Sequence, residues 1–131
     1  MIITLAGANT FLVQLELERL MLKFVKEHGD LALERLDGEE IEYPKLAESL
    51  HSLAFLTVRK MVIIKRPSAN KEFAENFEKI IKTVPETTDL VLVEPKPDKR
   101  TAFYKFIQKQ TEFHEFKDLD VSIKDLKIGV P

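Results

Sequence analysis

Compact apolar runs and helically spaced apolar positions alternate along this chain, and this alternation predicts its secondary structure. Short runs of aliphatic and β-branched residues are typical of buried strands. The expected strands cover residues 2–6, 31–36, 61–64, 90–93 and 112–116. Between them, apolar residues recur at the spacing of one helix face. The expected helices cover residues 11–28, from Pro44 to about 56, 71–82 and 99–109.

The segment after the first expected strand looks like a helix-capping turn. Gly7 makes the turn, and either Asn9 or Thr10 can cap the helix that follows. Phe11 and Leu12 are expected to anchor the start of that helix in the core.

Strands that alternate with helices predict an α/β fold, with three αβα layers built on a parallel sheet. The chain has 131 residues, of which 44% are hydrophobic and 32% charged, and this composition is typical of one soluble globular domain. Periodicity does not give the order of the strands in the sheet.

Charge and cysteine content exclude several functions. With 20 basic and 22 acidic residues the formal net charge is −2, which argues against a basic surface covering the whole protein. The absence of cysteine excludes disulfides, zinc–thiolate sites and thiol catalysis. We also expect a cytoplasmic protein outside the membrane, because no apolar run could cross a bilayer and no signal peptide is apparent.

Motifs for nucleotide or metal chemistry are weak or missing. A phosphate loop needs several glycines and a lysine, but residues 7–12 contain one glycine, no lysine and the bulky Phe11. Glu94 ends a central strand without the second acid of a receiver-like magnesium pocket, and is expected to be solvated. The histidines, at positions 28, 51 and 114, lack metal-ligand spacing. No cofactor, metal or catalytic residue is therefore predicted.

Two further segments could contact a partner. Lys99 and Arg100 follow Asp98, which can cap the next helix, and the two cations could meet phosphate or a partner, although such charge runs are usually solvated. The apolar stretch 53–56 closes the second expected helix. It is either core or an exposed anchor for a partner, and the pattern alone favours core.

Taken in order, four segments of the chain resemble the DNA polymerase III delta subunit family. In the first, Asn9 stands where the family usually has Asp. The segments cover residues 5–12, 36–40, 52–64 and 90–101. Each motif is weak alone, whereas their order and spacing are more specific.

This resemblance implies an AAA+-like core, of the P-loop NTPase type but without a functional phosphate loop, and a sheet order of 5-1-4-3-2. Family members carry a helical lid and a collar domain after this one. Residues 1–119 would then form the clamp-binding domain, and residues 120–131 a tail or a linker to those absent domains.

The resemblance also implies a function in DNA replication. The family's first domain binds the ring-shaped sliding clamp (the beta subunit) and helps to open it, as a non-ATPase part of the polymerase III holoenzyme. Phe55 and Leu56 align with the apolar pair that enters the clamp, so exposure of at least one of them becomes the expectation. Leu53 is grouped with that pair as a clamp contact, and Arg59, with Lys60, would lie at the rim. Other loader subunits would bind through the absent domains and DNA through the assembled complex, so the isolated domain should be a monomer.

Two other hypotheses remain open. One is a degenerate nucleotide-binding or receiver-like domain, which residues 7–12 argue against. The other is an unrelated α/β interaction domain, which buried Phe55 and Leu56 side chains would favour.

Overall fold

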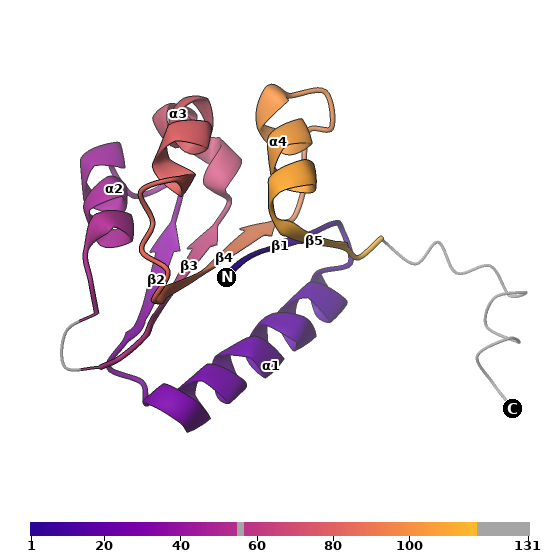
Figure 1. Ribbon diagram of the computed structural model, residues 1–131. Helices are drawn as coiled ribbons and strands as arrows, with labels where there is room; N and C mark the ends of the chain where they lie inside the picture. Colours follow the sequence, from indigo (N-terminus) through magenta and orange to yellow (C-terminus); the bar gives the residue numbers. More distant parts are fainter. Residues whose placement is uncertain (55–56, 118–131) are drawn as a thin grey trace, which may run out of the picture.

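The computed structural model describes residues 1–54 and 57–117, and they form a five-stranded parallel sheet with helices on both faces (Figure 1). The strands are β1 (Ile2–Ala6), β2 (Leu33–Asp37), β3 (Lys60–Lys65), β4 (Thr88–Glu94) and β5 (Glu112–Glu115). The helices are α1 (Thr10–His28), α2 (Tyr43–His51), α3 (Lys71–Ile81) and α4 (Ala102–Gln110), and a 3₁₀ turn covers Pro67–Ala69. The predicted α/β class is confirmed.

The strands are ordered β2-β3-β4-β1-β5, and all neighbours are parallel. Read from the other edge, this is the 5-1-4-3-2 order that the family resemblance implied. Every residue of the central β4 is buried, as expected for a parallel strand covered on both faces.

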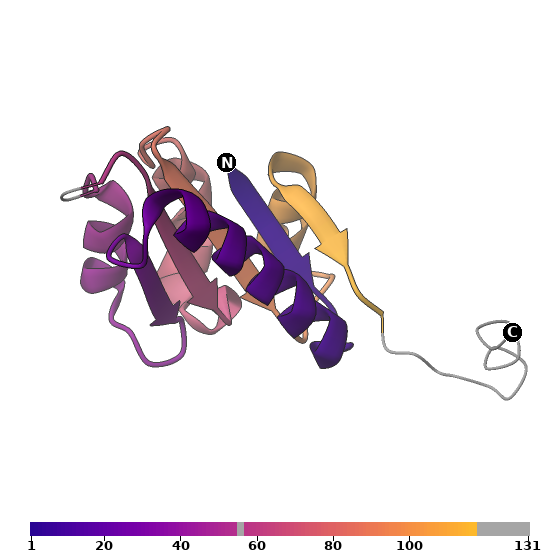
Figure 2. The same ribbon diagram turned by 90° about the horizontal axis from the view of Figure 1, so that it is seen from below.

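One helix covers one face of the sheet, and three helices cover the other. Figure 1 shows α1 alone below the sheet and α2, α3 and α4 above it, and Figure 2 shows α1 crossing the sheet from β1 toward β2. The buried side of α1 consists of residues at helical spacing, namely Val13, Leu17, Leu20 and Phe24. They pack on Ile3, Leu5 and other sheet residues.

Aromatic rings dominate the core on the other face. The rings of Phe73, Phe77 and Phe103 meet edge to face, with centroids 5.3–6.3 Å apart. This arrangement matches the quadrupole preference of aromatic pairs. It locks α3 to α4 over the middle of the sheet.

Three expectations about element ends were wrong. Helix α2 ends at His51, so Leu53 lies beyond the helix instead of on its apolar stripe. Phe11 does not anchor α1, because its side chain is 73% exposed. Helix α4 begins at Ala102 with Thr101 as its cap, while Asp98 accepts the Arg100 N–H in the preceding turn.

Within residues 1–54 and 57–117, no helix is both long and apolar enough to span a membrane.

Candidate partner-binding site

The connection from α2 to β3 exposes large apolar side chains. We call residues 52–59 the α2–β3 loop. Leu53 is 71% exposed and Val58 is 79% exposed, on either side of positions 55 and 56. Phe55 and Leu56 themselves lie outside the described residues. Two large apolar side chains exposed in one short connection are the kind of feature that, as a contiguous patch, marks a contact surface.

Lys60 fastens the carboxyl end of α2 to the start of β3. Its ammonium group donates to the Ser49 carbonyl oxygen and, at 2.7 Å, to Ser52 Oγ, and it lies 3.3 Å from Glu34. A cation at the end of a helix also complements the helix dipole. Lys60 is 3% exposed, so the expectation that it lies at the rim of a contact was wrong.

Arg59 fastens the other end of the loop to β4. Its Nη2 atom is 2.7 Å from Asp89 Oδ1 and donates to the Glu86 carbonyl oxygen at 3.1 Å. This hydrogen bond to Asp89 raises the pKa of Arg59 above its ordinary value. Thr57 Oγ1 donates to the Arg59 carbonyl oxygen at 2.9 Å. Leu53 and Val58 therefore project from a connection whose two ends are fixed by Lys60 and Arg59.

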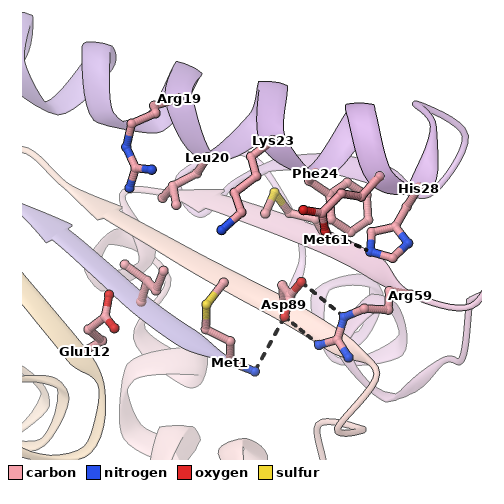
Figure 3. Close-up of a pocket in the computed structure, with 12 residues that line it drawn as sticks. Met1, Arg19, Leu20, Lys23, Phe24, His28, Arg59, Met61, Asp89 and Glu112 are labelled. Carbon is pink, nitrogen blue, oxygen red and sulfur yellow. Dashed lines mark hydrogen bonds and ion pairs between the residues drawn. The ribbon is translucent and has the colours of Figure 1, made fainter.

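A hollow of about 430 Å³ adjoins Arg59 at the edge of the sheet where the strands begin, here called the amino edge. Figure 3 shows Arg19 and Lys23 reaching from α1 toward the strands, and Asp89 bridging Arg59 and the Met1 amino group. Basic and acidic groups are mixed along its wall, and ion pairs already engage Arg59 and Asp89. The hollow offers no concentrated charge for a ligand.

The opposite, carboxyl edge of the sheet holds the crevice where nucleotides bind in many α/β folds. It measures about 250 Å³ and lies between the ends of β1 and β4, bordered by Gly7, Thr10, Lys65 and Arg66. The connections from β1 and β4 leave on opposite faces of the sheet, so this is the topological switch point.

Three N–H groups around Gly7 have side-chain or carbonyl acceptors in the following turn or in neighbouring segments. Gly7 donates to the Glu94 carbonyl oxygen at 3.0 Å, and Asn9 donates to that of Phe116 at 3.1 Å. The Leu12 N–H is capped by Asn9 Oδ1 at 3.1 Å. A phosphate loop must instead aim such groups at the ligand, so the prediction of a capping turn agrees with this geometry, and Asn9 is the cap.

Comparison with known families agrees with this architecture. The model of the DNA polymerase III delta subunit family matches residues 4–117. The chain belongs to this family. The match includes residues of all five strands, the α2–β3 loop and the turn at Gly7.

A solved structure of the delta family is also similar to this chain. It is the Bacillus subtilis DNA clamp loader delta protein, with a TM-score of 0.76 and 27% sequence identity over 90% of this chain. The chain spans 38% of that protein's length. Comparison with curated protein sequences finds no match.

Lys99 and Arg100 do not join the α2–β3 loop in this delta-family domain. They follow the carboxyl end of β4, whereas the loop leads into the amino end of β3, so the two lie at opposite edges of a parallel sheet. Lys99 pairs with Glu115 at 2.9 Å, and Arg100 with Asp98 at 3.0 Å. Both cations are well exposed, so contact with phosphate or a partner stays a prediction.

Glu94 was expected to be solvated, and that was wrong. It is 4% exposed, and one carboxylate oxygen accepts the Ser68 N–H at 3.0 Å. Burial raises the pKa of Glu94, against the smaller lowering effect of its hydrogen bonding to Ser68. Its position at a strand end thus serves to hold the 3₁₀ turn after β3.

Two features of the site escaped the sequence analysis of this delta-family domain. Val58 was not singled out, although it stands in the same connection as Leu53. Lys60 was placed at a rim, although it shares strand parity with the buried residues Val62 and Ile64, which indicates an inward side chain. In the described residues, no group of histidine and acidic side chains is arranged to hold a metal ion.

Proposed function

We propose that this domain binds a ring-shaped sliding clamp in DNA replication through the α2–β3 loop, with Phe55 and Leu56 as the anchors and Leu53, Val58 and Arg59 around them. The observation that carries the proposal is the exposure of Leu53 and Val58 on a fixed base, in a chain of the delta family. The printed name of the similar Bacillus subtilis protein, a clamp loader delta protein, supports the same partner.

The mechanism is binding without chemistry. Two large apolar side chains that enter a pocket contribute a few kcal/mol, at about 25 cal/mol per Å² of buried apolar area. The Lys60 and Arg59 contacts fix the base of the loop before binding, which reduces the ordering that binding requires. Clamp opening follows if the loop fits the open clamp better than the closed one.

The domain would not hydrolyse nucleotides, because residues 7–12 lack the lysine and further glycines of a phosphate loop, and the N–H groups of Gly7, Asn9 and Leu12 already bond to protein acceptors. In this proposal residues 1–119 form the clamp-binding domain, and residues 120–131 lead toward the lid and collar that the family resemblance implies. Other loader subunits would bind through those domains, and DNA would be reached through the assembled complex.

Calorimetric titration of the chain with its cognate sliding clamp tests the proposal. The Phe55→Ala/Leu56→Ala variant should lose more than about 2 kcal/mol of binding free energy, as anchor residues do. Leu53→Ala should weaken binding as well, because Leu53 borders the same contact.

Leu22→Ala is a matched control, because Leu22 is as exposed as Leu53, at 71%, but lies on α1. It should bind with unchanged affinity. Equal binding by the double variant and the wild type would place the contact elsewhere, and a wild-type chain that does not bind would contradict clamp binding by this domain.

A further inference from the structure

The connection between α1 and β2 exposes another large apolar side chain at the amino edge of the sheet. We call residues 29–32 the α1–β2 turn. Leu31 in this turn is 80% exposed, which is as much as Val58 and more than Leu53 in the α2–β3 loop. A single exposed leucine is ordinary on a protein surface, so its meaning depends on what lies beside it.

The α1–β2 turn lies beside the start of β3. The Ala32 carbonyl oxygen accepts the Met61 N–H at 2.8 Å, and Leu33 is the parallel partner of Met61. Leu31 directly precedes Ala32, and Val58 precedes β3 by only a short stretch of chain. Figures 1 and 2 both show the connection from α1 to β2 next to the beginning of β3. The two exposed side chains therefore belong to neighbouring connections at one corner of the sheet.

The backbone on both sides of Leu31 is held in place. The Gly29 N–H donates to the Val25 carbonyl oxygen at 2.8 Å where α1 ends, and the Asp30 carbonyl oxygen accepts the Leu33 N–H at 3.3 Å. The side chain of Ala32 is buried in the core on the α1 side of the sheet. A partner that covers Leu31 would therefore have to order little more than one side chain.

The α2–β3 loop alone is too small for a stable interface. An interface of standard size buries about 800 Å² on each partner and involves about 20–30 residues a side, whereas the loop consists of residues 52–59. A partner bound to the loop must therefore also contact the segments around it. Among these, the α1–β2 turn offers a large apolar side chain that is already in solvent.

We propose that Leu31 is part of the surface that binds the sliding clamp, so that this surface includes the α1–β2 turn as well as the α2–β3 loop. This inference rests on the proposed function and adds to it a contact from a different part of the chain. Leu31 lies beside the loop, and the clamp reaches it by continuing the contact that covers Val58.

Calorimetric titration of the 131-residue chain with its cognate clamp tests the contribution of Leu31. Leu31→Ala should raise the Kd about five- to tenfold, because the carbons removed no longer leave water on binding. Leu31→Asp should raise it by more than about tenfold, because a carboxylate would lose its water at the contact. The matched controls are Leu22→Ala and Leu22→Asp, because Leu22 is also well exposed but lies on α1. They should bind as the wild type does.

Two further measurements separate a contact from an effect on folding. Urea denaturation should give the Leu31 variants the stability of the wild type, because the side chain is in solvent. In the wild-type chain, addition of the clamp should change the methyl chemical shifts of Leu31 together with those of Leu53 and Val58, but not those of Leu22. Unchanged Leu31 shifts in a chain that binds the clamp would overturn the inference.

The outcomes distinguish this inference from the proposed function. If the Phe55→Ala/Leu56→Ala variant loses binding while both Leu31 variants bind as the wild type does, Leu31 has no part in the contact and clamp binding by the loop stands. A wild-type chain that does not bind the clamp would overturn both. A dimer of the chain in light scattering that Leu31→Asp dissociates would also overturn the inference, because a second copy would then cover Leu31.

Discussion

Lys60 illustrates how a buried charge can hold a binding loop in place. Removing an ammonium group from water is unfavourable unless its protons find acceptors. Here the carbonyl oxygen of Ser49, the hydroxyl of Ser52 and the carboxylate of Glu34 supply them. The same contacts end α2 and turn the chain outward before the exposed Leu53.

Lys60→Met tests this role, because methionine keeps the apolar stem and removes the charge. The free energy of unfolding should fall by about 1–3 kcal/mol, since acceptors in the interior lose their donor. Clamp affinity should fall too, because the base of the α2–β3 loop loosens. Urea denaturation measures the first effect. The control is Lys65→Met, at the exposed end of the same strand, which should change stability by less than about 0.5 kcal/mol. Equal stability of both variants would refute the role.

Glu94 makes stability depend on pH in a defined direction. Burial raises its pKa in the folded protein above the ordinary 4.5, so the folded state binds this proton more tightly than the unfolded state. The stabilisation is complete below pH 4.5 and is lost as the pH rises through the folded-state pKa. Glu94→Gln, which keeps an acceptor for Ser68, should remove this loss. The difference in unfolding free energy between variant and wild type should therefore shift in favour of the variant as the pH rises from 4 to 8. A difference that stays constant across that range would contradict the assignment.

At the scale of elements, hydrophobic periodicity was sufficient to place every strand and helix but not their ends. The stripe of Leu46 and Leu50 continues by spacing to Leu53, yet the helix ends earlier because Lys60, distant from that stripe in sequence, engages its last turn. Phe11 sits where an anchor was expected, but α1 turns it outward. Such ends depend on tertiary contacts that a local pattern does not contain. The exposure of Phe55 and Leu56 and their contact with a clamp remain predictions.

Gly7 lies in the turn between β1 and α1, against the residue that follows β5. Substitutions at Gly7 and Gly29 separate the cost of steric overlap from the cost of backbone strain. Its φ is +121°, and a Cβ there would overlap the backbone of Phe116. Gly29 also has positive φ, at +79°, but a Cβ there would meet open space. Gly29→Ala should therefore cost only the backbone strain, about 1–2 kcal/mol. Gly7→Ala should cost distinctly more, because the end of β5 must move. Urea midpoints of the two variants measure the difference. Equal losses of stability would show that the end of β5 moves away from the new Cβ at no cost in free energy.

At the scale of the whole molecule, the two edges of the sheet differ in kind. At the carboxyl edge, where α/β enzymes bind ligands, a crevice of about 250 Å³ remains, but the N–H groups of Gly7 and Asn9 beside it already bond to acceptors within the chain. The amino edge presents the exposed Leu53 and Val58 of the α2–β3 loop, and α1 alone covers one face of the sheet (Figure 1). Strand order followed from the family resemblance and not from periodicity, because hydrophobic spacing reports which face is buried and not which strand is the neighbour.

The oligomeric state follows from the exposed apolar residues of α1, Phe11, Leu15 and Leu22, and from the charge of Glu18 among them. Glu18 interrupts an apolar row that would otherwise run from Phe11 through Leu15 to Leu22, so wild-type chains should remain monomers of 15.1 kDa in light scattering. Glu18→Leu completes the row and removes the like-charge contact, and it should produce dimers at high concentration. Glu27→Leu, on another side of α1, adds the same apolar group without completing the row and should stay monomeric. A stable wild-type dimer, or dimers formed equally by both variants, would show that Glu18 does not keep the chains apart.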